Sequence, residues 1–396
     1  MAKSIIGYLS GPVDGREVYQ RYLENSGINY LGTSYMREFF EVCDKKNVAS
    51  IVVTSHDGEE YIHRQNRVVV ANFPKPGEIG GISYHQAMVR WTNKSLKFLH
   101  EEGCTHVILT DAQDYWFCIT RSPLRRAKII VALHGAIEPA FVKARPAHRL
   151  LHWINKHLFY RRYPAEILAA SPLISRQAHA YVGSAKTQIR LFLPLYSEAD
   201  FAKAYYSYPS AQQPFKLLFA GRIIANKGVF DLLDVAEQVR ERRQVDVLTI
   251  FAGDGPDLDR LRDQVEKRGL QENVSLLGYR GKQQLLALLS EVHAVIVPSR
   301  SELTEGFAMI CAEAILAGRP LITSKVCPAL EFLRPASIEA EMDQAASYAH
   351  AVFELASDAS LTAEKRQATA ELRKPFFDAA NSYGAKLEMS LIELGL

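Results

Sequence analysis

Short apolar runs rich in β-branched residues alternate with longer segments of helical periodicity along the first half of the chain. The runs that predict strands are 4–9, 49–54, 68–72, 106–110, 128–133, 167–170 and 188–192. The segments that predict helices are 34–46, 84–102, 145–160 and 173–181. This alternation is typical of βαβ units built on a parallel sheet.

The second half repeats the pattern more clearly. Strands are predicted at 216–220, 247–252, 274–277, 294–298 and 320–323, and helices near 229–243, 256–268, 282–290 and 307–317. Residues 196–214 lack clear periodicity, end in Pro214 and predict an interdomain linker. We therefore expect two doubly wound α/β domains, with a ligand in the cleft where the carboxyl ends of their strands meet.

Composition adds little to this fold class, but the charge is uneven. Among 396 residues, 48% are hydrophobic and 23% charged, which is ordinary for a globular protein. The net charge of +3 combines +7 over residues 1–200 with −4 over residues 201–396. The first half is therefore the better candidate to meet an anionic partner or a membrane surface. The imbalance is too mild to predict nucleic-acid binding.

Cysteine usage and the apolar runs bear on the compartment. The five cysteines are Cys43, Cys104, Cys118, Cys311 and Cys327, all in apolar contexts. Buried free thiols are the simplest interpretation and indicate a reducing compartment. The apolar run at the start is too short for a signal peptide, and no run approaches about 18 apolar residues. We expect a cytoplasmic protein that meets a membrane only peripherally.

The first of three informative runs follows the strand at 216–220. Gly221 and Arg222 come directly after the strand, and Lys227 stands five residues later at a predicted helix start. Two cations on a short loop above a helix N-terminus would suit an anionic diphosphate. Two solvated surface cations are the alternative.

The second run is 253–256, Gly-Asp-Gly-Pro, after the strand at 247–252. It resembles the opening of a dinucleotide fingerprint but lacks the third glycine, so a plain tight turn is the simpler interpretation. Asp257 and Asp259 match a DxD metal pattern, yet they fall on a charged helix face. No metal site is predicted.

The third run carries two carboxylates around a predicted helix start. Glu305 lies in a loop after the strand at 294–298, and Glu313 lies eight residues later among apolar residues. Backbone N–H groups at Gly306, Phe307 and Ala308 would form an anion site. The two carboxylates could accept hydrogen bonds from sugar hydroxyls. Burying the Glu313 carboxylate among apolar residues would be costly unless it had such a partner. A merely polar position on an apolar helix is the alternative for Glu313.

Taken together, these runs resemble the family-4 retaining glycosyltransferases over about residues 215–335. The shared features are Glu-x7-Glu followed by Gly-x-Pro, with Gly-Arg-x4-Lys upstream. The resemblance implies the GT-B fold. It implies an acceptor domain at 1–195, the linker at 196–214, a donor domain at 215–374, and a helix at 375–396 that crosses back to the first domain.

The resemblance also implies roles for matching residues. Arg222 and Lys227 would contact the donor diphosphate, Glu305 would lie beside the transferred sugar, and Glu313 would bond the ribose. Tyr279, just after the strand at 274–277, would lie near the base.

The remaining implied positions complete the site. Gly221, Gly306, Phe307 and Ala308 would belong to the donor loops, and His134, in the strand-end pair His-Gly, would reach the cleft. The donor would be a nucleotide-diphosphate sugar, with a UDP-sugar slightly favoured, and no metal or other cofactor is expected.

Three departures from the family pattern stand out. Where the family commonly has Gly-Gly before a glutamate, this chain has Val326-Cys-Pro before Glu331. Ala308 stands where glycine is common. The N-terminal glycine loop could be the one with Gly11 and Gly15 or the one with Gly27 and Gly32.

Residues 139–165 form a basic, acid-free segment just after His134. Its cations are Lys143, Arg145, Arg149, Lys156, Arg161 and Arg162, interleaved with aromatic and histidine residues. Leu150, Ile154 and Leu158 lie at helical spacing. A basic, aromatic, amphipathic helix is typical of a membrane interface. Alternatively, its apolar stripe packs on the sheet while the cations face water.

The sequence thus predicts a retaining, metal-independent glycosyltransferase. It would move a sugar from a nucleotide-diphosphate donor to a glycan, lipid-linked or small-molecule acceptor. A nucleotide-sugar epimerase of similar architecture, or a catalytically silent sugar-nucleotide-binding protein, are the alternatives.

Overall fold

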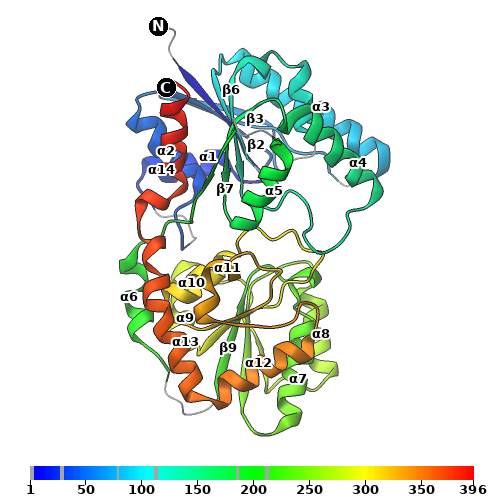
Figure 1. The fold of residues 1–396 in the computed structure, drawn as a ribbon, viewed down its shortest axis with the longest axis vertical. Coiled ribbons are helices and arrows are strands. Elements are labelled where there is room, and N and C mark those ends of the chain that lie inside the picture. The colour runs from blue at the N-terminus through cyan, green and yellow to red at the C-terminus, as the bar shows by residue number, and fades with distance from the viewer. Residues whose placement is uncertain (1–3, 27–30, 78–79, 111–114, 184–186, 210–213) are drawn as a thin grey trace.

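The structure is a computed structural model that describes residues 4–26, 31–77, 80–110, 115–183, 187–209 and 214–396. Two α/β domains lie one above the other along the long axis of the molecule (Figure 1). Each domain is a sheet with helices on both faces, as the alternation of apolar runs and helical periodicity predicts.

The first domain is built on an eight-stranded sheet in the order β3-β4-β2-β1-β5-β6-β7-β8. Its strands are β1 (Ile5–Leu9), β2 (Ala49–Thr54), β3 (Tyr61–Gln65), β4 (Val68–Asn72), β5 (His106–Thr110), β6 (Lys128–Leu133), β7 (Pro164–Ala169) and β8 (Gln188–Leu191). Its helices are α1 (Gly15–Leu23), α2 (Tyr35–Lys45), α3 (Gly81–Glu101), α4 (Pro146–Asn155) and α5 (Pro172–Val182). Only the edge pair β3–β4 is antiparallel among the pairs of this sheet.

The second domain has a six-stranded parallel sheet in the order β11-β10-β9-β12-β13-β14. Its strands are β9 (Phe215–Ala220), β10 (Val247–Ala252), β11 (Val274–Leu276), β12 (Ala294–Val297), β13 (Leu321–Thr323) and β14 (Ser337–Glu339). The helices from here to the C-terminus are α6 (Glu198–Tyr206), α7 (Asp231–Arg242), α8 (Leu258–Lys267), α9 (Lys282–Glu291), α10 (Met309–Leu316), α11 (Leu330–Leu333), α12 (Ala345–Ser357), α13 (Ala359–Leu372) and α14 (Tyr383–Glu393).

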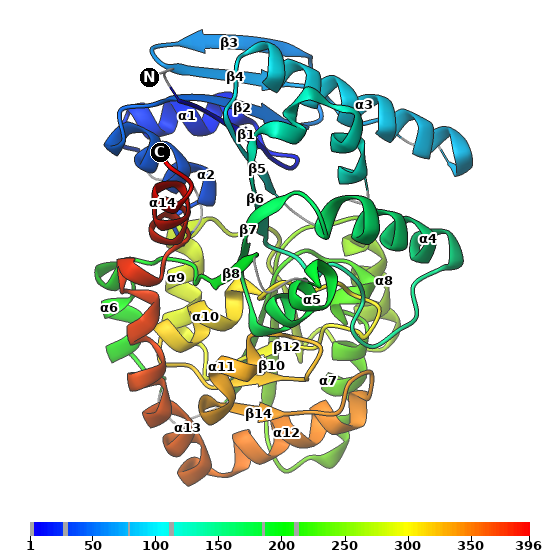
Figure 2. The ribbon, with the colours of Figure 1, turned by 45° about the horizontal axis from the view of Figure 1, so that its top comes forward.

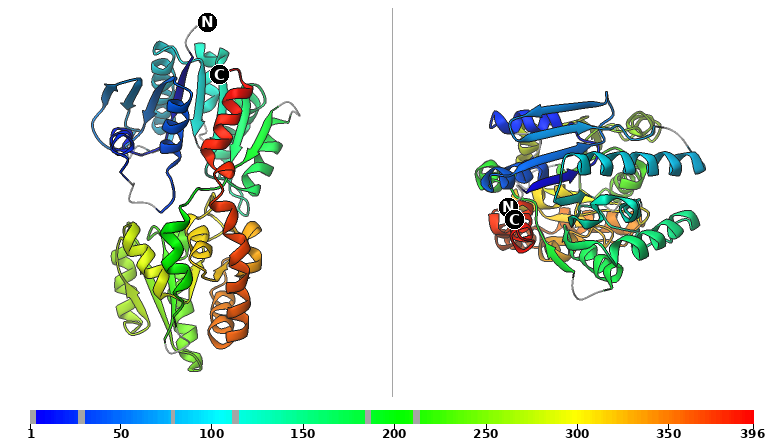
Figure 3. Two further views of the ribbon diagram at one scale, coloured as in Figure 1. Left: turned by 90° about the vertical axis from the view of Figure 1, so that its left-hand side faces the viewer. Right: turned by 90° about the horizontal axis from the view of Figure 1, so that it is seen from above.

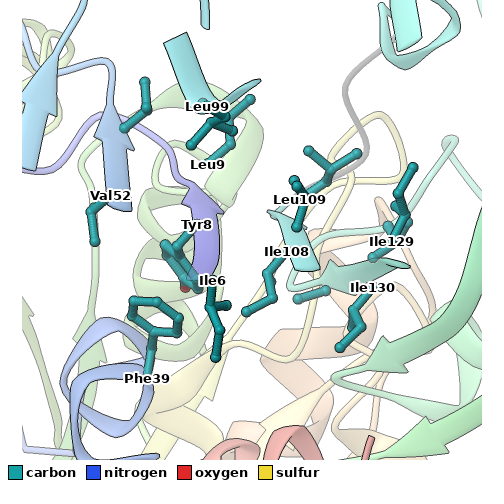
Figure 4. Close-up of a cluster of buried hydrophobic side chains, with 14 of the residues drawn as sticks. Ile6, Tyr8, Leu9, Phe39, Val52, Leu99, Ile108, Leu109, Ile129 and Ile130 are labelled. Atoms are coloured by element: carbon teal, nitrogen blue, oxygen red, sulfur yellow. The ribbon is translucent and has the colours of Figure 1, made fainter. Parts of the chain in front are cut away.

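Both faces of the central strands are buried, which explains their continuous apolar runs. Figure 4 shows this in the first domain, where Tyr8 of β1 packs on Phe39 of α2 with ring centroids 4.5 Å apart. Alternate β1 side chains face opposite sides of the sheet, so Leu9 lies towards Leu99 of α3. Because the parallel strands are covered on both faces, the position of the sheet is fixed. The loops that follow the carboxyl ends of its strands are thereby held at one edge.

The C-terminal segment passes along the second domain as α13 and then returns to the first domain as α14, beside the N-terminal strands (Figure 3). The buried Glu38 of α2 accepts a 2.7 Å hydrogen bond from the backbone N–H of Gly384, in the first turn of α14. A carboxylate at a helix N-terminus is favoured by the unsatisfied N–H groups there. Burial nevertheless raises the pKa of Glu38 to about 7.

A second set of polar contacts holds the other side of α14. The buried Glu166 of β7 accepts hydrogen bonds from Ser390 of α14 at 2.5 Å and from Arg190 of β8 at 2.9 Å. Arg190 also pairs with Glu393. The last helix is therefore an integral part of the first domain.

Several elements differ from the sequence-based expectation. The segment expected as a linker contains α6, which packs on α9 and α10, and Phe201 of α6 is fully buried. Only Phe201 and Ala204 of this helix are buried, so its periodicity is weak in sequence. Residues 210–213 of that segment lie outside the described residues.

Other elements escaped prediction because their patterns are faint. Helix α1 is short and polar, with Asp14 as its N-cap accepting from the N–H groups of Arg16 and Glu17. Strand β3 is an edge strand whose residues are all partly or fully exposed, and β14 has three residues. The helix expected at 145–160 is α4 followed by a π-helical turn, Lys156–Tyr160.

Candidate functional site

One cavity of about 620 Å³ lies between the two domains, at the carboxyl ends of both sheets. All ten residues singled out by the sequence line it. They are His134, Gly221, Arg222, Lys227, Tyr279, Glu305, Gly306, Phe307, Ala308 and Glu313. Residues from both halves of the chain, up to 179 positions apart in sequence, therefore meet at one site, as expected where open α/β sheets face each other.

Lys227 and Glu305 form the closest charged contact in this cavity. The Lys227 ammonium lies 2.5 Å from a Glu305 carboxylate oxygen, which also accepts a hydrogen bond from Ser299 at 3.2 Å. Both side chains are largely shielded from water, so the pair is less screened than a surface ion pair. Arg222 is exposed on the same side of the cavity. Neither cation lies at the start of an α-helix, because Lys227 ends a 3₁₀ turn and α7 begins at Asp231.

The loop after Glu305 differs from the expected helix start near Phe307. Helix α10 begins at Met309, and Ala308 precedes it with φ +59°, in the left-handed region. This conformation costs a residue with a Cβ about 1–2 kcal/mol, which is why glycine is the usual choice. Glu305 is therefore not on a helix, and the bend at Ala308 turns both glutamates towards the cavity.

Glu313 lies on α10 with its side chain buried against the cavity wall. Tyr196 Oη lies 3.5 Å from the Glu313 Oε1 atom, a long hydrogen bond from the segment between the domains. Burial raises the pKa of Glu313 to about 7, and the Tyr196 contact opposes part of that rise. With Tyr196 as its one hydrogen-bond partner among the described residues, at a long distance, this buried carboxylate has acceptor capacity left for a ligand's hydroxyl groups.

His134 follows β6 and sits in a group of aromatic rings. It stacks on Tyr35 of α2 at 4.2 Å between centroids, and Phe192 and Tyr383 approach it at 5.5 and 5.6 Å. Tyr383 is the first residue of α14, so the returning helix helps to hold this ring. The ring cluster around His134 thus draws on four distant parts of the chain.

Gly306 marks one point at which the domains touch. A Cβ built on Gly306 would lie 1.8 Å from the carbonyl oxygen of His134. No real Cβ approaches an oxygen so closely, so only glycine permits this backbone contact. Two residues predicted independently, one in each domain, are therefore direct neighbours.

The Gly-Asp-Gly turn at 253–255 belongs to the site as well. Gly253 and Asp254 line the cavity, and a Cβ on Gly253 would lie 1.8 Å from the carbonyl oxygen of Gly221. The turns after the neighbouring strands β9 and β10 thus pack backbone to backbone. The interpretation as a tight turn was right, but the turn has a further role as a wall of the cavity.

Comparison with known proteins finds a family match in the second domain. Residues 204–372 match the family described as glycosyl transferases group 1. Glycogen synthase of Mycobacterium tuberculosis is 35% identical over 113 residues, which cover 28% of this chain and 26% of that protein. GDP-mannose:cellobiosyl-diphosphopolyprenol alpha-mannosyltransferase of Xanthomonas campestris is 33% identical over 126 residues, or 31% and 32% of the two chains. These matches span about a quarter to a third of the relatives' length.

The likeness to solved structures extends over the whole chain. Anabaena HepE in complex with UDP superposes with a TM-score of 0.68 at 17% identity, covering 99% of this chain and 100% of that one. The chain has the GT-B fold. Its second domain is similar to the glycosyl transferases group 1 family.

Within this GT-B cleft, sequence reasoning missed several lining residues. Arg280 follows Tyr279 on the loop into α9, Lys282 is the first residue of α9, and both line the cavity. A cation just after a strand end had been the signal for Arg222, and the same signal was present here. Lys282 pairs with Asp200 of α6 at 2.7 Å. Tyr35 gave no signal, because nothing in sequence links it to His134.

The structure also places the N-terminal glycine loops. Leu31 lines the cavity, and a Cβ on Gly32 would lie 3.3 Å from Tyr196 and 3.4 Å from Met309 of the second domain. Gly15 instead packs against Thr54 inside the first domain. The loop before α2 is therefore the one at the cleft, while Gly27 lies outside the described residues.

The basic segment keeps much of its apolar surface in the open. Helices α3 and α4 project from the same side of the first domain (Figure 2). The exposed large apolar side chains of this segment are Phe141, Val142, Leu150, Trp153 and Leu158. Leu151 packs against the core, but the predicted stripe stays exposed at Leu150 and Leu158. The alternative in which the whole stripe covers the sheet is therefore wrong.

Membrane spans and metal sites can be assessed for the described residues, 4–26, 31–77, 80–110, 115–183, 187–209 and 214–396. No helix in these ranges is long and apolar enough to cross a membrane. In the same ranges, no three histidine, cysteine, aspartate or glutamate side chains gather as a metal site. All five cysteines are buried and free, as expected.

Proposed function

We propose that this protein is a retaining glycosyltransferase of the family-4 type, which transfers a sugar from a nucleotide-diphosphate donor held in the interdomain cavity. The observation that carries the proposal is the meeting of Arg222, Lys227, Glu305 and Glu313 around one cavity of a GT-B fold. In the reaction, the bond between the sugar's anomeric carbon and the diphosphate breaks. The acceptor hydroxyl oxygen forms the new bond to the anomeric carbon on the same face, and its proton passes to the departing diphosphate.

We propose for each residue the part that the family resemblance implies. Lys227 and Arg222 neutralise the charge that develops on the departing diphosphate, a role that preorganised cations fill well. Glu305, 2.5 Å from Lys227, lies beside the transferred sugar. Glu313, about one turn into α10, accepts hydrogen bonds from the ribose. His134, across the Gly306 contact, faces the sugar and the acceptor.

The first experiment separates this function from its alternatives. The protein is screened by thermal shift against UDP-, GDP- and ADP-sugars, because a bound ligand raises the melting temperature by mass action. The best donor, radiolabelled, is then incubated alone. Slow release of nucleotide and free sugar supports a transferase, a new sugar epimer supports an epimerase, and binding without turnover supports a silent binding protein. UDP-sugars are the slightly favoured donors.

The two glutamates should separate affinity from turnover. Glu313→Gln should weaken donor binding about tenfold or more, because a hydrogen bond to a charged group contributes about 1.5–3 kcal/mol. Glu305→Gln should act mainly on kcat, since the sugar is next to the bond that breaks. Binding by calorimetry and steady-state kinetics measure both. Unchanged affinity in Glu313→Gln would show that the ribose role is wrong.

Donor affinity should also depend on pH through Glu313. Its pKa of about 7 means that the carboxyl is ionised above that pH and protonated below it. The ionised form accepts hydroxyl hydrogen bonds at both oxygens, so affinity should rise with pH through about 7 and fall as pH drops. A titration between pH 5.5 and 8.5 should show this slope in the wild type. The slope should be absent in Glu313→Gln.

On the acceptor side, we propose a lipid-linked or anionic glycan and peripheral contact with the inner face of a membrane. The segment 139–165 carries six cations and no acid, and it exposes Leu150 and Trp153. Apolar side chains between cations suit the boundary between lipid headgroups and acyl chains. One relative that matches over 31% of this chain is named for a diphosphopolyprenol-linked acceptor, which is in line with this proposal.

Charge reversal at Arg161 and Arg162 should weaken binding to anionic vesicles. Each cation near such a surface contributes about 1 kcal/mol, so the double reversal should lower vesicle affinity by at least tenfold, and added salt should lower it steeply in the wild type. Co-sedimentation with vesicles of mixed neutral and anionic lipid measures this. Arg262→Glu with Lys267→Glu on α8 is the matched control. Wild-type protein that ignores anionic vesicles at low salt would contradict the proposal.

A further inference from the structure

A second cavity, of about 360 Å³, lies wholly within the first domain. It is lined by Tyr84 and His85 of α3, Tyr115, His148 and Leu151 of α4, and the backbone at Gly80 and Gly81. Its volume is within the range of small-molecule sites. None of the residues that line the donor cavity contributes to this second cavity.

The sheet topology puts this cavity at the carboxyl edge of the first sheet. Tyr115 follows β5, and α4 follows β6. These strands are neighbours in parallel register, with Leu109 opposite Val131. His134 comes directly after β6. The cavity therefore lies at the same carboxyl edge of the sheet as His134, over adjacent strands.

The lining has the chemistry of a saccharide subsite. The rings of Tyr84 and His85 are 5.8 Å apart and inclined at 70°, and His85 Nδ1 lies 2.8 Å from Tyr115 Oη. Aromatic faces contact the C–H faces of a sugar ring, while phenol and imidazole groups donate and accept hydrogen bonds with its hydroxyls. No carboxylate is among the described residues that line it.

The two faces of α4 differ in character around this cavity. His148 and Leu151 line the cavity, whereas Leu150 and Trp153 on the same helix are each 59% exposed. One helix thus separates a polar, aromatic pocket from an outward apolar face. A sugar in the pocket could stay attached to a lipid that lies against that face.

We propose that this cavity binds the saccharide unit of the acceptor. The proposal rests on the proposed glycosyltransferase function and narrows it, because the acceptor then carries a pyranose ring near its reacting hydroxyl. Transfer from the donor cavity would lengthen a glycan, not glycosylate a protein side chain or a simple lipid alcohol.

The test uses methyl pyranosides of gluco, galacto, manno and N-acetylglucosamine configuration, in both anomers, as probes. Saturation-transfer NMR on the whole protein should show binding of at least one probe. Tyr84→Ala and His148→Ala should each weaken that binding at least tenfold. Tyr84→Phe, which keeps the ring, should restore most of it. Tyr206→Ala and His350→Ala, at exposed positions in the second domain, are the matched controls.

The outcomes keep this inference apart from the donor assignment. Thermal shift with the nucleotide sugar is measured on the same samples and reports the donor cavity alone. Donor binding with no pyranoside binding, or pyranoside binding that Tyr84→Ala and His148→Ala leave unchanged, would overturn the acceptor subsite only. Absence of any nucleotide-sugar binding would overturn the proposed function itself. His148 is exposed, so His148→Ala gives a folded variant even where Tyr84→Ala does not.

Discussion

Lys227→Ala should lower the turnover of the donor sugar by about 100-fold or more. Loss of one preorganised group that stabilises developing charge has an effect of about 10²–10³ in kcat. Lys227 is well placed for this role, since its ammonium lies in the cavity, is largely shielded from water and already faces an anion, Glu305. The effect is measured as the rate of donor hydrolysis in the absence of acceptor, monitored through the release of nucleoside diphosphate.

The control for this variant is Lys267→Ala, at an exposed position on α8. The same assay tests whether the cationic side chains stabilise the departing diphosphate without a metal ion. Activity that disappears in EDTA and returns with Mn²⁺ would contradict a metal-independent mechanism. Turnover of Lys227→Ala within a few-fold of wild type would contradict the assignment of Lys227 to the diphosphate.

Gly306→Ala should also reduce activity by about 100-fold, for a steric reason. The added Cβ would lie 1.8 Å from the carbonyl oxygen of His134, and backbone atoms on both sides leave no side chain to move away. The domains must then separate at this point by at least 1 Å. A displacement of that size between reacting groups can cost about 10²-fold in rate. Kinetics and small-angle scattering of the donor complex test both parts.

Gly135→Ala is a sharp control for this prediction. It is the neighbour of His134 in the same contact, but a Cβ there meets nothing within 4 Å. It should keep activity close to that of the wild type. Equal activities for Gly306→Ala and Gly135→Ala would show that the contact between the domains has no bearing on catalysis.

The sequence predicted the donor half of the site well because its signals are local. The strand ends there are followed by loops with residues whose chemistry is unusual for a turn, such as Arg222 directly after β9 and Glu305 in the loop after β12. The buried position of Glu313 was also predictable, since its neighbours on the helix are apolar. All ten predicted residues line one cavity, although their individual roles stay predictions.

The parts that escaped prediction depend on contacts between distant segments. Tyr35 reaches the site only because α2 packs beside β1, and Tyr383 only because α14 returns to the first domain. The left-handed backbone of Ala308 has no signature in sequence, because alanine is a good helix former and predicts an earlier helix start. Helix α6 was taken for a linker because two buried residues are too few to set a period.

We propose that the enzyme transfers a sugar from a nucleotide donor with retention of the anomeric configuration. The most direct test of this proposal is proton NMR of the sugar that the wild-type enzyme releases from its best donor, recorded before the anomers equilibrate. We predict a first product with the anomeric configuration of the donor, together with free nucleoside diphosphate. A first product of inverted configuration would contradict the retaining mechanism. Failure to release nucleoside diphosphate from any UDP-, GDP- or ADP-sugar, with or without acceptor, would contradict the glycosyltransferase assignment.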